Sequence, residues 1–195
     1  MERKEFAVVA GPNGAGKSTL SKYYLKSECF DGDLMALNLR REHPDWPERW
    51  ISGTVVGNLE KNKTAAIAEN RNFAFETNFT NDLIINLINE FKNANYKISL
   101  FYFGINCLED SVMRVEQRIH SGGHIVSPEI AKYNFSECPK RVLQNIQLFD
   151  YMTFIDGIMP YGRVVASFRK KDGWREVSEN VPRWFEILFA SNLLL

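Results

Sequence analysis

The chain has 195 residues, of which 45% are hydrophobic and 25% charged, so it is long and apolar enough for one folded domain with a sizeable core. Lysine and arginine together number 24, as do aspartate and glutamate; the balanced charge argues against general attraction to nucleic acid. No apolar run approaches the length of a membrane span, and Cys29, Cys107 and Cys138 lack the spacing of a metal site or disulfide framework. We expect a cytoplasmic protein, with no room for a leader peptide before a first strand at Phe6.

A phosphate-binding loop follows that first strand, Phe6 to Ala10, and precedes a helix-compatible segment, Leu20 to Lys26. The loop matches the complete G-x-x-x-x-G-K-[ST] motif in its expected strand–loop–helix setting. Its glycines let successive N–H groups point at a phosphate, and the helix N-terminus adds its positive dipole end. The motif predicts binding of ATP and Mg²⁺, with the lysine on the β- and γ-phosphates and the serine hydroxyl as a metal ligand. The predicted nucleotide-binding residues are Gly11, Pro12, Asn13, Gly14, Ala15, Gly16, Lys17, Ser18 and Thr19.

Further along the chain, helical and strand-like segments alternate. Helices are predicted at 34–41, 48–70, 81–95, 108–120, from Pro128 onward, at 141–149 and at 184–195, and strands at 73–75, 97–103, 151–155, 163–168 and 174–177. This alternation indicates βαβ units and a mainly parallel sheet. The sequence therefore predicts an α/β fold, a three-layer α/β/α P-loop NTPase with a kinase-type sheet. We expect a single domain over residues 1–195, with a helical lid at about 108–140 and a C-terminal strand and helix at 161–195.

Acidic residues follow three of the predicted strands or connections. They are Asp31 with Asp33, then Glu76, and then Asp156. Ligands of open α/β sheets bind at the carboxyl ends of strands, and phosphoryl transfer to a hydroxyl needs a carboxylate near the acceptor. Asp33 is the first choice for that carboxylate, and Glu76 is the second, as an acceptor-binding or Mg²⁺-ordering group. The alternative for Asp31 and Asp33 is that they only cap the following helix.

Arginines on the 108–120 helix are candidates for closing over the phosphates. Arg114 and Arg118 share a helix face, and Gly122 and Gly123 follow as a possible hinge. The alternative is a solvated helix face with Glu116 as an ion-pair partner. Ser121-Gly122-Gly123 also occurs in the ABC-transporter signature, but the late strand ends Ile155-Asp156-Gly157 instead of Asp-Glu, so we reject an ABC ATPase. The three histidines match no zinc pattern.

Taken together, several segments resemble the zeta-toxin family of P-loop kinases, particularly its stand-alone bacterial branch. The matching segments are GPNGAGKSTL (11–20), FDGDLMA (30–36), FAFETNF (73–79) and RVEQRIHSGGHIVSPEIAKY (114–133). The resemblance implies transfer of the γ-phosphoryl group of ATP·Mg²⁺ to a sugar hydroxyl, since characterised toxins of this family phosphorylate UDP-N-acetylglucosamine. No segment of the sequence is antitoxin-like, so we expect any antitoxin to be a separate protein.

Roles for individual residues follow from the same resemblance. The catalytic residues would be Lys17, Asp33, Arg114 and Arg118, with Asp33 as the base. The acceptor would be surrounded by Asp33, Glu76, Thr77 and His124. A further contact to the phosphates would come from Lys132. The chain departs from the family at Asn78, where threonine is usual, at the inserted Ser127, and at Lys132, where arginine is common. The acceptor therefore stays open. Alternatives are a kinase of another metabolite or of a nucleic-acid end, and a non-transferring ATP-binding or ATPase module that acts through a partner.

Overall fold

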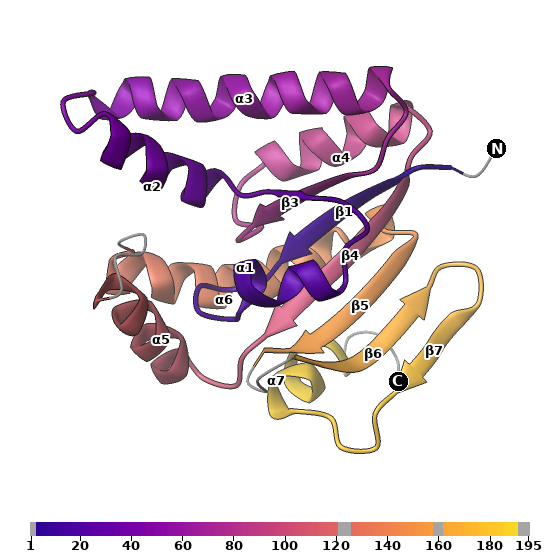
Figure 1. Cartoon of the computed structure of the whole chain (residues 1–195). Coiled ribbons are helices and arrows are strands. Elements are labelled where there is room, and N and C mark those ends of the chain that lie inside the picture. The colour runs from indigo at the N-terminus through magenta and orange to yellow at the C-terminus, as the bar shows by residue number, and fades with distance from the viewer. Residues whose placement is uncertain (1–2, 121–125, 158–161, 191–195) are drawn as a thin grey trace.

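The structure, a computed structural model, describes residues 3–120, 126–157 and 162–190 (Figure 1). Seven strands form one sheet in the order β2-β3-β1-β4-β5-β6-β7. Neighbours from β2 to β5 pair parallel, whereas β5–β6 and β6–β7 pair antiparallel, which confirms the mainly parallel sheet. The strands are β1 (Glu5–Ala10), β2 (Cys29–Phe30), β3 (Phe73–Thr77), β4 (Lys97–Gly104), β5 (Tyr151–Asp156), β6 (Arg163–Arg169) and β7 (Gly173–Val177).

The helices follow the apolar stripes and capping residues of the sequence. Asp31 caps α2 by accepting a hydrogen bond from the Leu34 N–H at 2.9 Å, and Ser127 caps α6, which opens with Pro128. The helical segments are α1 (Lys17–Leu20), η1 (Ser21–Tyr23), α2 (Gly32–Glu42), α3 (Glu48–Ala68), α4 (Leu83–Asn93), α5 (Leu108–His120), α6 (Pro128–Gln144), η2 (Ile146–Leu148), α7 (Arg183–Phe185) and η3 (Glu186–Ala190).

Three elements differ from the sequence-based expectations. The helix after the phosphate loop is α-helical only to Leu20 and tightens to a 3₁₀ turn, because Tyr24 and Leu25 turn back to pack against the sheet. The helices expected before and after Pro139 are one helix, α6. Pro139 removes a backbone hydrogen bond, but its ring and Cys138 are buried, so packing outweighs the local penalty. The two-residue strand β2 was not predicted, since its length gives no alternation to detect.

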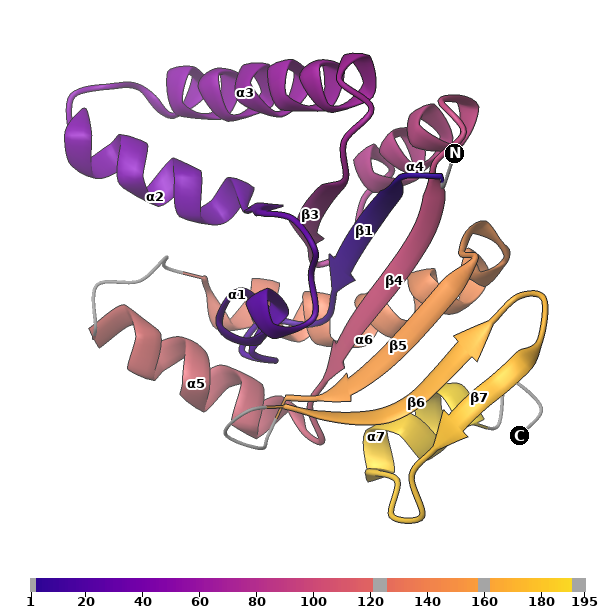
Figure 2. The same ribbon diagram turned by 45° about the vertical axis from the view of Figure 1, so that its right-hand side comes forward.

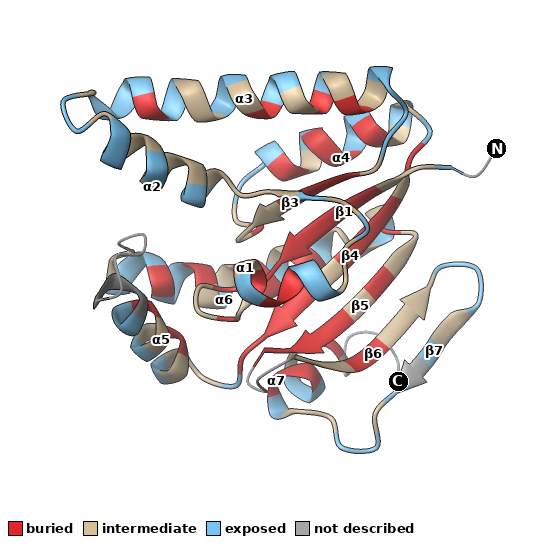
Figure 3. Ribbon diagram, viewed as in Figure 1, coloured by how far each residue is buried: buried red, intermediate tan, exposed pale blue. Residues whose placement is uncertain are grey.

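The core is unequal on the two faces of the sheet. A large cluster joins β1, β3, β4, β5 and β6 to α3, α4, α6 and the C-terminal helical segment. Figure 3 shows β1, β4 and β5 as mostly buried, whereas most of β6 is intermediate. A smaller cluster lies on the other face, where Leu20 of α1 packs with Val9, Phe103 and Ile155. None of the helices within the described ranges is both long and apolar enough to cross a membrane. The small cluster fixes the phosphate loop directly above the carboxyl ends of β1 and β4.

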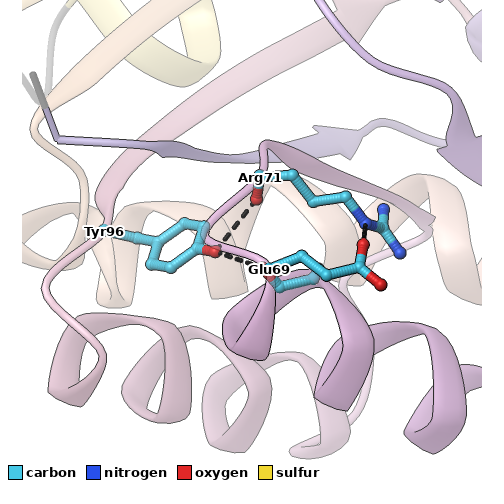
Figure 4. Close-up of polar contacts among 4 residues, drawn as sticks. Glu69, Arg71 and Tyr96 are labelled. Carbon is cyan, nitrogen blue, oxygen red and sulfur yellow. Dashed lines mark hydrogen bonds and ion pairs between the residues drawn. The ribbon is translucent and has the colours of Figure 1, made fainter.

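A buried tyrosine fixes the turn between α3 and β3. Tyr96 directly precedes β4. Its hydroxyl group lies 2.8 Å from the Ala66 carbonyl oxygen and 2.9 Å from the Arg71 carbonyl oxygen (Figure 4). The Arg71 guanidinium in turn donates to Glu69 at 2.8 Å. These contacts hold the return from α3 into β3, and thereby the strand that delivers Glu76 and Thr77 to the candidate site.

Candidate active site

The phosphate loop connects β1 to α1 and requires glycine for two different reasons. At Gly11 a β-carbon would lie 2.3 Å from the Phe103 carbonyl oxygen, so the loop's close approach to β4 leaves no room for a side chain. Gly14 has φ of +73°, a left-handed conformation that L-residues adopt rarely. The motif therefore encodes the backbone path that turns the N–H groups of the loop inward.

Side chains from α5 and α6 hold this loop from outside. The Ser111 hydroxyl donates to the Asn13 carbonyl oxygen at 2.6 Å, and the Asn134 amide donates to the Asn13 side-chain oxygen at 2.8 Å. Arg114 donates through Nη1 to the carbonyl oxygens of Gly14, at 3.1 Å, and Gly157, at 3.0 Å. The sequence reasoning missed Ser111 and Asn134, because neither belongs to a motif and both reach the loop through tertiary packing.

Lys17 is 7% exposed, and its ammonium group lies among three oxygen acceptors. It donates to the carbonyl oxygens of Gly11, at 2.8 Å, and Pro12, at 3.0 Å, and to the Asn78 side-chain oxygen, at 2.9 Å. Asn78 is the residue that replaces the family's usual threonine. The Asn78 side chain therefore contacts the lysine of the P-loop motif.

Ser18 and Glu76 form an oxygen pair at the end of the loop. The Ser18 hydroxyl donates to Glu76 Oε1 at 2.9 Å. Hydroxyl and carboxylate oxygens are the ligands that Mg²⁺ prefers, and Mg²⁺ usually takes only one or two protein ligands together with substrate phosphates. No group of three or more His, Cys, Asp or Glu side chains gathers as a metal site in the described part of the chain. The pair thus fits a nucleotide-bound magnesium ion rather than a protein cage.

A pocket of about 480 Å³ opens beside this pair, between β3 and the α2–α3 arm. Its lining includes Asp33, Glu76, Thr77 and Asn78, so the structure brings together three of the four residues predicted to surround the acceptor. Asp33 is exposed in the first turn of α2, whereas Asp31 is the residue that caps this helix. The Thr77 hydroxyl accepts a hydrogen bond from the Phe79 N–H at 2.9 Å and retains its own proton for donation.

Among the residues that the structure describes, the others predicted for the site do not line this pocket. Thr19 and Lys132 are exposed, the latter on α6 two residues before Asn134. Asp156 is buried, and its Oδ2 atom lies 3.8 Å from Nη2 of Arg163 on β6. Asp156 is not among the residues that line the pocket. Arg118 belongs to the last turn of α5, but its side chain lies outside the described part of the structure, as does His124 entirely.

The Cys138 thiol belongs to the large core cluster, close to the phosphate loop. Cys138 is fully buried, and burial raises its pKa to about 12, although Lys17, the Gly11 N–H and the Tyr102 hydroxyl act in the opposite direction. Burial likewise raises the pKa of Tyr102. Both groups are therefore neutral near pH 7.

These features define a P-loop nucleotide-binding protein with a pocket beside the loop. Residues 1–168 match the family model described as zeta toxin, and the chain belongs to the zeta toxin family and is a P-loop kinase. A 127-residue segment, 64% of the chain, is 28% identical to an uncharacterized protein of Haemophilus influenzae and covers 88% of it.

Solved structures show the same fold at low sequence identity. The structure from the PezAT chromosomal toxin–antitoxin system of Streptococcus pneumoniae matches with a TM-score of 0.63 and 16% identity, over 97% of this chain and 78% of that one. AvrRxo1-ORF1, in its complex with AvrRxo1-ORF2 with sulphate ions, matches with a TM-score of 0.67 and 12% identity, over 95% of this chain. The present chain spans 63% of the length of that matched chain.

Proposed function

We propose that this kinase transfers the γ-phosphoryl group of ATP to a hydroxyl group of a small acceptor bound in the pocket beside Glu76. The observation that carries the proposal is that one pocket presents Asp33, Glu76 and Asn78, while Glu76 and Asn78 also contact Ser18 and Lys17 of the phosphate loop. The acceptor pocket and the phosphate loop therefore share a wall. Following the resemblance, UDP-N-acetylglucosamine is the first acceptor to test.

The chemistry requires positioning and charge neutralisation more than covalent catalysis. The acceptor oxygen bonds to the γ-phosphorus while the bond from that phosphorus to the β,γ-bridging oxygen breaks, and ADP leaves. Asp33 orients the acceptor hydroxyl and takes its proton. Lys17 and the inward N–H groups of the loop neutralise charge that develops on the phosphates. Mg²⁺ on Ser18, ordered by Glu76, would add charge neutralisation at the β- and γ-oxygens.

Arg114 has a more specific role in this proposal than a freely moving lid residue. Its guanidinium group holds the carbonyl oxygens of Gly14 and Gly157, so it fixes the phosphate loop against the end of β5. Arg118, four residues further along α5, is the arginine that we assign to the transferring phosphoryl group. Lys132 and His124 remain proposed contacts of the phosphates and of the acceptor.

A transfer assay with γ-labelled ATP and a panel of UDP-sugars tests the proposal. Asp33→Asn should lower transfer by about 10²- to 10⁴-fold, the usual contribution of a general base, without changing ATP affinity. Asp31→Asn is the matched control, because asparagine keeps the α2 cap and leaves Asp33 in place. Equal transfer by the Asp33→Asn and Asp31→Asn variants would remove Asp33 from the mechanism. ATP binding without labelling of any sugar nucleotide would direct the search to other acceptors, or to a partner that responds to bound ATP.

We further propose that the activity is toxic and that a separate antitoxin protein restrains it, because a similar structure comes from a toxin–antitoxin system. Induced expression of the wild-type chain in a bacterial host should arrest growth, whereas the Asp33→Asn variant should not. Equal growth of both strains, at matched protein levels, would contradict toxicity while leaving the kinase proposal to the transfer assay.

A further inference from the structure

The second groove of interest lies at the opposite end of the sheet from the phosphate loop. It has a volume of about 500 Å³ and is floored by β1, β4, β5 and the end of β6. In Figures 1 and 2, α1 lies in front of the carboxyl ends of the strands, and none of the described helices lies in front of their amino-terminal halves. An α/β sheet usually has both faces covered, so this half-open face is unusual.

The strand residues on this face change from apolar to polar where the helical cover stops. The paired registers place Glu5 beside Lys97, and Ser99 beside Tyr151. Further along the same strands, Val9 and Phe103 belong to the small cluster under α1. The amino-terminal half of this face therefore carries mainly polar side chains, as expected for a surface in contact with water or a polar ligand.

Positive charge is concentrated around this groove although the whole chain has no net charge. Five cationic side chains from four separate segments line it, with Glu5 as the single carboxylate in the lining, and the Glu5 carboxylate is already held by the Ser99 hydroxyl at 2.5 Å. The cationic residues are Arg3, Lys4, Lys26, Lys97 and Arg169. Arg169 also forms an ion pair with Asp172 at 3.2 Å, and the net excess of positive charge that is left favours an anionic ligand.

The remaining lining residues distinguish between kinds of anion. Two aromatic rings, those of Phe101 and Tyr151, are partly exposed on neighbouring strands, and the Arg169 guanidinium lies 5.0 Å from the centre of the Tyr151 ring. Rings and guanidinium planes stack on nucleobases. The lining contains no aliphatic side chain that could anchor an acidic peptide, although peptide grooves usually supply apolar pockets.

We propose that this basic sheet groove binds a single strand of nucleic acid, with its phosphates on the cationic rim and bases against Phe101 and Tyr151. The inference does not depend on the proposed transfer reaction. The groove extends along the sheet from Glu5 to Phe101, which pairs with Val9 of β1, and none of the loop residues Gly11 to Thr19 belongs to its lining, so a bound strand leaves the nucleotide site open. The balanced net charge is consistent with this, because the basic field is local.

Fluorescence anisotropy of a labelled 12-nucleotide single strand, as RNA and as DNA, tests the proposal with the full chain. Three to five neutralised phosphates predict that log K falls with log[salt] with a slope of about −2 to −3.5. The Lys4→Gln/Lys26→Gln double variant should weaken binding and make the slope less negative by about 1.4, for two lost phosphate contacts. Lys61→Gln/Lys140→Gln, which neutralises exposed lysines of α3 and α6 outside the groove, should leave both values unchanged.

A stacking variant separates the aromatic contribution from the charge. Tyr151→Leu should lower affinity at least about fivefold, as expected for one lost base–aromatic contact, with an unaltered salt slope. ATP binding by each variant serves as the check that it is folded. No salt-dependent binding, equal binding by the groove and control double variants, or tighter binding of an acidic 20-residue peptide than of either oligonucleotide would each overturn the proposal.

Discussion

The two sides of the candidate site are built differently. On the phosphate side, the loop is held by Ser111 and Arg114 of α5, by Asn134 of α6 and by Asn78, which directly follows β3, and Lys17 is almost fully buried. On the acceptor side, Asp33 is exposed on α2, a helix without a single buried residue. The phosphate side is therefore preorganised by many short contacts, whereas the acceptor side depends on how α2 rests against α3.

This difference indicates where the kinase has freedom to change. A loop that is fixed on several sides tolerates few substitutions but serves any reaction that uses the same nucleotide. An exposed arm can vary its side chains and its angle without disturbing the core. We therefore expect substitutions on the phosphate side to abolish activity, and substitutions on the acceptor side to alter which acceptor is used.

On the phosphate side, the largest effect is expected from removing the buried ammonium group. Lys17→Ala should reduce phosphoryl transfer by about 10²- to 10³-fold or more, since a preorganised charge on the phosphates is lost. Lys22→Ala, at an exposed position of the following turn, is the control and should retain activity. Transfer measured with γ-labelled ATP decides the result. A Lys17→Ala variant with near wild-type transfer would mean that the phosphates bind elsewhere.

The second effect concerns the contact between the loop and β5. A β-carbon at Gly157 would lie 1.9 Å from the Ala15 carbonyl oxygen, so Gly157→Ala must push the loop away from the strand. We expect it to lower the free energy of unfolding by about 1–3 kcal/mol or more and to weaken ATP binding.

Gly57→Ala provides a control of opposite sign for this substitution. No heavy atom lies within 4 Å of a β-carbon at this position in α3, so alanine should stabilise the helix by about 0.5–1 kcal/mol. Thermal unfolding and ATP titration of both variants measure the contrast. Equal stability of the two variants would show that the loop is less firmly fixed than its contacts indicate.

A smaller effect is expected at Asn78, which joins the two sides. Its side-chain oxygen accepts one of the three Lys17 hydrogen bonds, and a phosphate that binds Lys17 must compete for those protons. Asn78→Ala should therefore tighten ATP binding about five- to tenfold, or about 1–1.4 kcal/mol, which is the net contribution of one ordinary hydrogen bond. Asn89→Ala, exposed on α4, should leave the Kd unchanged. Weaker ATP binding by Asn78→Ala would instead make Asn78 a direct nucleotide contact.

The sequence predicted the phosphate side better than the acceptor side because the former is encoded locally. The motif from Gly11 to Thr19 fixes its own backbone path, and the pattern of strands and helices around it indicated the fold. Ser111 and Asn134 escaped notice because they act at positions about a hundred residues from the loop, where no spacing rule connects them to it. Asp31 and Asp33 could not be told apart until the structure showed which of them caps α2.

The smallest predicted effect lies wholly on the acceptor side. Arg40 of α2 and Glu48 of α3 form a two-point ion pair, with N–O distances of 2.6 and 3.1 Å, and both residues line the acceptor pocket. Their side chains are 37% and 64% exposed, so Glu48→Gln should change the free energy of unfolding by less than about 1 kcal/mol. Because the pair sets how α2 carries Asp33, the KM for the acceptor should rise about threefold while the KM for ATP stays constant.

Salt and a second ion pair provide the controls for that experiment. Raising the ionic strength should reproduce the effect in the wild-type chain, since exposed charges are screened. Lys140→Gln removes an exposed pair with Glu137, outside the acceptor pocket, and should leave both KM values unchanged. If Glu48→Gln lowered kcat with both KM values constant, the arm would act on the chemical step itself, and the acceptor side would be as closely fitted to the reaction as the phosphate loop.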